Sequence, residues 1–241
     1  MEASIDLNIK QSFVLKSEHI KHIIELLNNN IGNISISADC EDKINRKFNS
    51  VDQLLSYSNP PGFRIQSLSI RARSDDSDKF ARVAFANESL YPIKFTAEAT
   101  EDIVINLKDG FLKIITMTKA WYDRFAKLDI FGVMLLILYG MCIILILCIA
   151  IWGPNTPKSN VVNLRATAFG FLAGTGTVIL FVLTGFLISK FRNKIFPIGT
   201  FAWGHGAENY EFLEKIRWTI VIGFIVSFLS GLVGSIIISL R

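Results

Sequence analysis

Charge is missing from three long stretches in the second half of this sequence. They cover residues 130–152, 166–189 and 218–240, and none contains Asp, Glu, Lys, Arg or His. Each exceeds the roughly 20 apolar residues that an α-helix needs to cross a bilayer, where backbone groups must bond within the helix. The sequence therefore predicts an all-α bundle of three transmembrane helices over these residues.

The same lack of ionisable groups limits what such a bundle could do. Proton relays and ion-coupled transporters generally place ionisable side chains at membrane depth, so their absence weighs against an active transporter. A passive pore lined by Ser, Thr and Gly remains an alternative, because selectivity filters can use backbone carbonyls or hydrophobic gates.

Cysteine and catalytic motifs are also scarce. Of three cysteines, Cys142 and Cys148 lie in the first apolar stretch and Cys40 stands alone in the first half. No paired framework is present, which fits a reducing compartment. The N-terminus lacks a basic patch followed by an apolar run, so no cleavable signal peptide is expected. P-loop, G-x-G-x-x-G, nucleophile-elbow and zinc-ligand patterns are absent. We therefore expect no enzyme activity, no cofactor and no metal site.

The formal net charge of +4 is unevenly distributed. Residues 1–127 hold about 17 basic and about 17 acidic residues, so this half is near neutral and nucleic-acid binding is not expected. The basic excess flanks the apolar stretches, at Lys190, Arg192, Lys194, Lys215, Arg217 and Arg241.

The basic residues also predict an orientation. Most of those near the apolar stretches fall on the side of residues 1–128, and the positive-inside rule places that side in the cytoplasm. The expectation is a multi-pass protein of the plasma (inner) membrane, with its N-terminal domain cytoplasmic and its C-terminus extracytoplasmic.

Residues 1–128 have the patterns of an α+β domain. Strict alternation predicts strands around Ile5 and Ile36, and an antiparallel meander over residues 63–97. Apolar spacings of three and four after Ser17 predict a helix to about residue 30. Residues 101–127 favour a helix, although Lys108-Asp109-Gly110 could instead form a hairpin turn. The sum is a mixed or antiparallel sheet with helices on one face.

Small residues repeat every four positions in the second and third apolar stretches. Such ridges allow helices to approach closely in lipid. Packing within one protomer and a homo-oligomeric contact both fit the pattern. The residues are Gly170, Gly174, Gly223, Ser227, Gly231 and Ser235.

Residues 190–217 join the last two stretches. Their segment 196–206 is too apolar for a free loop and too short to cross a membrane, which predicts a re-entrant or interfacial segment. Trp203 and His205 are its candidate functional residues, with His205 as a pH-sensing group or a plain interfacial residue.

Two sets of polar side chains in the first half are candidate binding sites. His19 and His22 have a spacing that could hold a metal, but both fall opposite the apolar stripe, which indicates a solvated helix face. Arg71, Arg73 and Arg82 lie on neighbouring predicted strands and suit phosphate or carboxylate. The alternative for these arginines is a solvated sheet face balanced by acidic residues, namely Asp75, Asp76 and Asp78.

Together these patterns predict a domain at residues 1–128 and a transmembrane domain at residues 129–241. The leading hypothesis is a cytosolic ligand- or partner-binding sensor domain coupled to an oligomeric transmembrane bundle, as a membrane-perturbing effector or gated pore. A passive membrane anchor or assembly subunit is the alternative, and a membrane-bound enzyme is a weaker one. The expected partners are the lipid bilayer, further copies of the chain, and a cytosolic protein or small anionic ligand.

Overall fold

The computed structural model describes residues 1–76, 78–87, 90–152 and 181–239, and omits the side chains of 142, 145–152 and 232–239. The chain forms two compact units. The first combines Met1–Ala126 with Ile195–Arg241, and the second is Lys127–Lys194. Each unit is described by itself.

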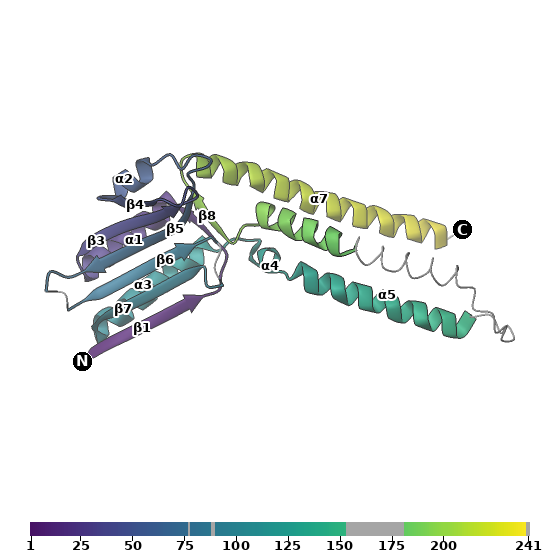
Figure 1. The fold of residues 1–241 in the computed structure, drawn as a ribbon, viewed down its shortest axis with the longest axis horizontal. Coiled ribbons are helices and arrows are strands. Elements are labelled where there is room, and N and C mark those ends of the chain that lie inside the picture. Colours follow the sequence, from purple (N-terminus) through teal and green to yellow (C-terminus); the bar gives the residue numbers. More distant parts are fainter. Residues whose placement is uncertain (77, 88–89, 153–180, 240–241) are drawn as a thin grey trace. The chain divides into compact units, whose positions relative to one another are not determined.

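A six-stranded sheet organises the first unit, with its strands in the order β1-β7-β6-β5-β3-β4 (Figure 1). Every neighbouring pair is antiparallel, which confirms the α+β class and the antiparallel sheet expected for residues 1–128. The short strand β4 and the pairing of β1 beside β7 were not foreseen. The strands are β1 (Glu2–Ile9), β3 (Asn33–Cys40), β4 (Asn45–Phe48), β5 (Ile65–Arg73), β6 (Phe80–Ala86) and β7 (Ile93–Thr100).

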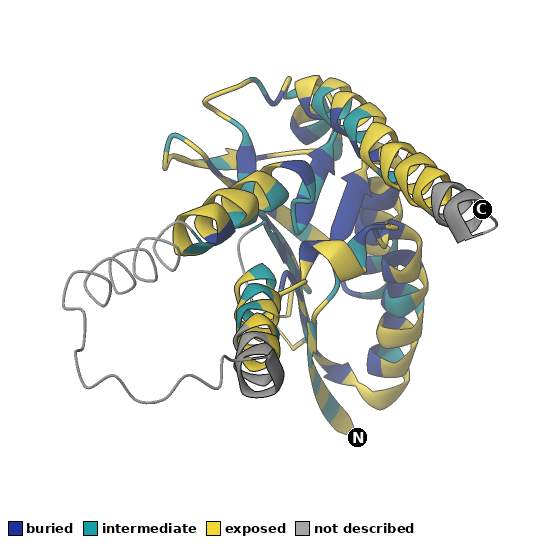
Figure 2. Cartoon of the chain, turned by 90° about the vertical axis from the view of Figure 1, so that its right-hand side faces the viewer, coloured by how far each residue is buried: buried dark blue, intermediate teal, exposed yellow. Residues whose placement is uncertain are grey.

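Two helices, α1 (Ser17–Asn30) and α3 (Glu101–Thr118), cover one face of this sheet (Figure 1). Every second residue of the central strands points toward them and is buried, as the dark bands of Figure 2 show. The rings of Phe95 on β7 and Phe111 on α3 stack with centroids 4.5 Å apart. Burial of this apolar face is the main stabilising term of the unit.

Local sequence explains the start of α2 and the close approach of α3 to α1. Ser50 caps the short helix α2 (Val51–Ser56), because its Oγ accepts a hydrogen bond from the N–H of Gln53 at 3.1 Å. Lys108-Asp109-Gly110 lies inside α3, so the hairpin alternative is wrong. At Gly110 a Cβ would lie 2.7 Å from Leu26 Cδ1, so glycine here lets α3 approach α1 closely.

A second, two-stranded sheet ties the C-terminal residues to the first unit. Strand β2 (Phe13–Lys16) pairs in parallel with β8 (Gly199–Ala202). Phe13 packs edge-to-face on Phe85 and on Phe201, with centroids 5.3 and 5.7 Å apart. Segment 196–206, expected to be re-entrant or interfacial, contains β8 and belongs to the first unit.

The long helix α7 (His205–Ser239) follows β8, and the four-residue helix α4 (Asp123–Ala126) closes the N-terminal part of the unit. The second unit contains α5 (Ile130–Trp152) and the helical residues 181–194. Asp129 caps α5, since its Oδ1 accepts from the N–H of Gly132 at 3.0 Å. The bounds of α5 match those of the first apolar stretch.

No helix formed by the described residues is long and apolar enough to cross a membrane. Most of the stretch 166–189 lies outside the described residues.

This finding contradicts the three-helix transmembrane bundle predicted for residues 129–241. The expectations that depended on that bundle are corrected with it: an integral membrane protein with a coupled oligomeric bundle or pore, a passive membrane anchor, and a multi-pass location in the plasma membrane. What remains of the predicted fold is the α+β unit, with six antiparallel strands and its covering helices.

Candidate anion-binding face

The face of the six-stranded sheet opposite α1 and α3 carries mostly polar side chains. We call it the open face. Cross-strand pairing places its residues in rows, and the central row runs from Asp6 through Thr96, Arg82 and Arg71 to Ser35. The next row on one side holds small, hydroxyl-bearing and cationic residues, namely Lys94, Ala84, Ser69, Ser37 and Lys47. The next row on the other side contains Glu98, Phe80, Arg73 and Asn33.

Arg71 and Arg82 lie directly opposite each other in the β5–β6 pair. Like charges in directly opposed positions destabilise an antiparallel pair. The Nε of Arg82 donates to Ser69 Oγ at 3.2 Å, and neither guanidinium forms an ion pair with a carboxylate among the described residues. The two cations are therefore held side by side without an internal counter-charge.

Arg73 is placed differently from the other two predicted arginines. It lies at the end of β5, opposite Phe80, beside a depression of about 380 Å³ that Glu2, Asp78 and Glu98 also line. Three acidic residues thus line the depression beside Arg73, and one of them, Asp78, belongs to the balancing set of the alternative. The structure brings Arg71 and Arg82 together and leaves Arg73 among carboxylates.

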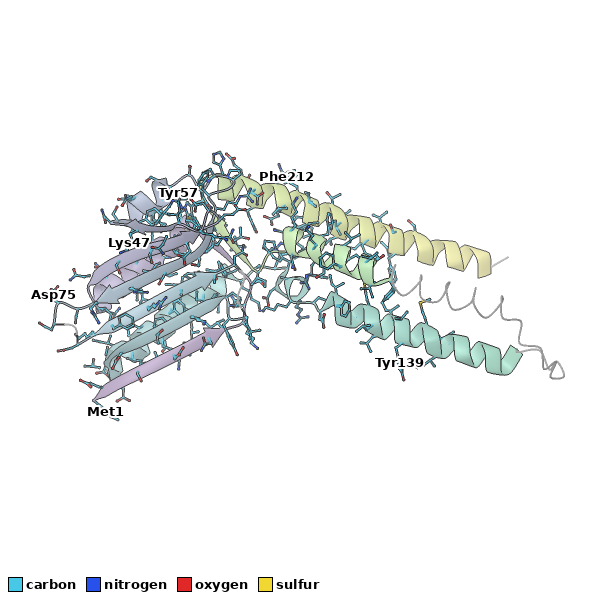
Figure 3. All side chains as sticks on the ribbon, viewed as in Figure 1. Met1, Lys47, Tyr57, Asp75, Tyr139 and Phe212 are labelled. Atoms are coloured by element: carbon cyan, nitrogen blue, oxygen red, sulfur yellow. The ribbon has the colours of Figure 1, made fainter. Side chains whose placement is uncertain are left out.

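Carboxylates also lie on the open face, at Asp6, Asp39 and Glu98, but none of these is directly opposite Arg71 or Arg82 in the strand pairing. Asp39 accepts hydrogen bonds from Asn45 at 2.6 Å and from Ser67 at 2.7 Å. These two bonds hold the pKa of Asp39 below its usual value. Asp75, at the turn labelled in Figure 3, accepts from Asn33 at 2.5 Å. Neither carboxylate is placed opposite Arg71 or Arg82.

A groove of about 480 Å³ adjoins Arg71 where β4 ends beside β3. Ser35 and Ser37 form its floor on β3, and Lys47, labelled in Figure 3, stands on its β4 side. The groove therefore presents hydroxyl groups and two cationic side chains. Guanidinium, ammonium and hydroxyl donors together are the groups that bind phosphate and carboxylate oxygens.

The two histidines of α1 are not a pair on one solvated face. His22 is exposed, but His19 is buried, and its Nδ1 accepts the backbone N–H of Lys16 at 3.2 Å. Burial lowers the pKa of His19, with the neighbouring carboxylate of Glu18 opposing that shift. Within the described residues no group of three or more His, Cys, Asp or Glu side chains could hold a metal ion.

The predicted interfacial residues Trp203 and His205 belong to the β8–α7 junction. Trp203 is buried in the core of the first unit and packs edge-to-face on Phe201. His205 is exposed, and its Nδ1 lies 3.0 Å from Glu208 Oε2. Between them, Gly204 has a φ of +53°, and a Cβ there would overlap the carbonyl group of Ser58.

The small-residue ridge is only partly described. Gly223, Ser227 and Gly231 are exposed on α7, and open space surrounds the position that a Cβ would take at Gly223 and at Gly231. Gly170 and Gly174 lie outside the described residues, as does the side chain of Ser235. The role of this ridge in helix packing or oligomerisation stays a prediction.

One buried polar cluster was not found from the sequence. Arg217 on α7 was predicted to flank a membrane helix, but it is fully buried. Its guanidinium carbon lies 4.1 Å from the ring centroid of Tyr122 and 5.4 Å from that of Tyr210. Its Nε donates to the carbonyl oxygen of Ile195 at 2.6 Å. Burial raises the pKa of both tyrosines, that of Tyr210 to about 12 with help from the Glu214 carboxylate.

Comparison with known proteins gives no match: no family model, no curated protein and no solved structure is similar to this chain. The candidate site therefore rests on its own geometry.

Proposed function

We propose that the first unit is a non-catalytic binding domain that takes a small anion, a phosphate or a carboxylate, on its open face. Arg71 and Arg82 are the contacting guanidinium groups, and Lys47 with the hydroxyls of Ser35 and Ser69 completes the donor set. This proposal keeps the predicted anionic ligand and leaves Arg73 out of direct contact.

The observation that carries the proposal is the unneutralised pair of opposed guanidinium groups. A fold gains nothing from placing Arg71 and Arg82 directly opposite each other without a carboxylate between them. An anion bound to both turns this repulsion into two charge-assisted hydrogen-bonding interactions. The neighbouring hydroxyls supply neutral donors that add specificity without further charge repulsion.

Binding without catalysis is the favoured form of this function. A catalytic site needs an acid, base or nucleophile within hydrogen-bonding distance of the reacting group. In the central row, Arg82 and Arg71 are flanked by the hydroxyl groups of Thr96 and Ser35, and neither β5 nor β6 contains His or Cys. Beside Arg71 and Arg82 the row thus supplies hydroxyl donors for an anion, and its carboxylate, Asp6, lies two strands away from Arg82.

Isothermal titration calorimetry on the full chain with inorganic phosphate and, separately, succinate tests the proposal at low and at physiological ionic strength. We expect saturable binding of one of the two anions that weakens with salt. A charged hydrogen bond contributes roughly 1.5–3 kcal/mol, so Arg71→Gln and Arg82→Gln should each weaken binding by about tenfold or more.

Lys108→Gln is the matched control. Lys108 is exposed on α3, which covers the other face of the sheet, so this variant removes one positive charge without touching the open face. Its affinity should stay close to that of the unaltered chain. Equal weakening by Lys108→Gln, or phosphate and succinate binding that persists in the Arg71→Gln/Arg82→Gln double variant, would contradict the proposal.

A further inference from the structure

One edge of the six-stranded sheet is uncovered along its whole length. β1 pairs with β7 on one side only, without a register shift, and among the described residues no strand pairs with its other side. Figure 3 labels Met1 at this edge and Lys47 near the opposite edge. That opposite edge is the four-residue strand β4, so the two edges differ in length as well as in surroundings.

The backbone groups that face outward from β1 can be assigned from its pairing. The carbonyl oxygen of Met1 accepts the N–H of Glu101, so odd-numbered residues direct their N–H and C=O toward β7. Even-numbered residues direct theirs away from the sheet. The outward-facing residues are Glu2, Ser4, Asp6 and Asn8.

The side chains of this edge form two different rows. On the core side, Ala3, Ile5, Leu7 and Ile9 are half-buried and pack only partly against the core. On the open face the row is polar. Proline and lysine, which commonly protect sheet edges, are absent from β1, and its regular pairing leaves no bulge to twist the edge away. Unpaired strand edges of this kind pair readily with another strand.

We propose that a second copy of the chain pairs with this edge, antiparallel and related by a two-fold axis that passes through Ile5. In this register Ser4 lies opposite Asp6 of the second copy, and Glu2 lies opposite Asn8 of the second copy. Each of the four outward-facing residues then exchanges both backbone hydrogen bonds with a residue of the other copy. The two sheets become one continuous sheet.

Charge and packing select this register over its neighbours. Moving the strands by two positions one way opposes Asp6 to Asp6, and moving them the other way leaves the backbone groups of Asn8 unpaired. In the proposed register each carboxylate faces a hydroxyl or an amide instead of another carboxylate. On the core side Ile5 meets Ile5, and Leu7 meets Ala3, so the half-buried apolar row is covered. A two-fold interface of this kind is the commonest symmetry of homo-oligomers.

Disulfide crosslinking tests the register directly. In a full chain with its three cysteines replaced by Ser, Ile5→Cys places two thiols in a pair whose Cα atoms are about 4.5 Å apart, within the range that a disulfide spans. Mild oxidation should then give a crosslinked dimer in high yield. Leu7→Cys is the matched control, because its thiols would lie roughly 13 Å apart and should not crosslink.

A second pair of variants tests the backbone bonds without cysteine. Ser4→Pro removes an N–H that faces away from β7, a position where an edge strand tolerates proline, whereas Ser4→Ala keeps it. Analytical ultracentrifugation should show the dimer dissociation constant raised by about tenfold or more in Ser4→Pro and little changed in Ser4→Ala. Equal crosslinking of Ile5→Cys and Leu7→Cys, absence of any crosslink in Ile5→Cys, or equal dissociation constants for the two Ser4 variants would overturn the proposal.

Discussion

Two arginine environments in the first unit contrast sharply. On the open face, Arg71 and Arg82 stand opposite each other at the surface, with hydroxyl groups around them and no carboxylate partner in the described part of the chain. In the cluster around α7, Arg217 is fully buried between the rings of Tyr122 and Tyr210. The same side chain is thus exposed without an internal counter-charge in one region and enclosed by the fold in the other.

The difference lies in what compensates the charge. A buried guanidinium loses its hydration, and Arg217 recovers part of that loss from the faces of two aromatic rings and from the carbonyl oxygen of Ile195. Its Nη1 and Nη2 have no hydrogen-bond partner among the described residues. The pair Arg71 and Arg82 lies at the surface and keeps much of its hydration, so its main cost is mutual repulsion. Arg217 therefore serves the fold, whereas Arg71 and Arg82 are the guanidinium groups for which we propose a ligand.

Removing Arg217 should have the largest effect on stability. Arg217→Ala takes away the hydrogen bond to Ile195 and leaves a cavity between two tyrosine rings, so we expect a loss of about 2–5 kcal/mol in the free energy of unfolding. Urea titration monitored by tryptophan fluorescence measures it, because Trp203 is buried in the same unit and Trp121 stacks on Trp218 at 5.3 Å.

Arg217→Met separates the two contributions. Methionine keeps an apolar stem between the rings and removes a buried charge that has no carboxylate partner, so it should cost less than half as much as alanine. Equal losses for Met and Ala would mean that the guanidinium itself, through the rings and the carbonyl, supplies most of the stabilisation. A neutral Arg217→Ala would show that the buried position contributes nothing.

The sequence predicted the large sheet well for a simple physical reason. The alternation of apolar and polar residues in β3, β5, β6 and β7 comes from one buried and one open face, and this period of two is visible in a single chain. The facing of Arg71 and Arg82 follows from the same alternation and from the short β5–β6 connection. Both arginines could therefore be named before the fold was known.

The β2–β8 pair and the Arg217 cluster could not be found in this way. β2 and β8 are four residues each, they are separated by most of the chain, and a short apolar run does not reveal its partner. Arg217 follows a polar turn and precedes an apolar stretch, a pattern that also indicates a charge flanking a membrane helix. Only the tertiary contacts distinguish a buried cation from a flanking one.

The apolar stretches teach a related lesson. The absence of charge over residues 218–240 predicted a membrane helix, and the structure makes these residues, up to Ser239, the C-terminal part of α7, which begins at His205 directly after β8 of the sheet unit. Hydropathy alone describes the apolar part of such a helix and says nothing of the polar turns that precede it. Those turns carry Leu213 and Arg217, both buried in the first unit.

The histidines of α1 provide a second comparison of a buried and an exposed group, with a smaller expected effect. Burial lowers the pKa of His19 below its value in the unfolded chain, so between the two values the unfolded state binds more protons. Stability should therefore be complete above about pH 6.5 and should fall as the pH is lowered toward the folded-state pKa. Urea titrations between pH 7.5 and about pH 5 measure this slope.

His19→Asn should flatten the pH dependence, because its amide oxygen can still accept the Lys16 N–H and does not titrate in this range. His22→Asn is the matched control, since His22 is exposed on the same helix. If His22→Asn flattens the slope as much as His19→Asn, burial of His19 is not its cause.

The smallest expected change in stability tests most directly whether Arg71 and Arg82 repel each other. Arg71→Gln should raise the free energy of unfolding by roughly 0.2–1 kcal/mol at low salt, since it removes one of two like charges directly opposed on neighbouring strands. Salt should erase this gain, because Arg71 is exposed and Arg82 is half-buried, so that counter-ions can reach both groups. Arg82→Gln should give the same gain, and the double variant no further one, because the repulsion is already absent after either change. Phosphate binding should fall in the variants that become more stable, which is the trade-off expected where a fold keeps unfavourable charges for a ligand. Additive gains would show that the two arginines do not repel each other. Losses of stability in both single variants would show that Arg71 and Arg82 stabilise the sheet.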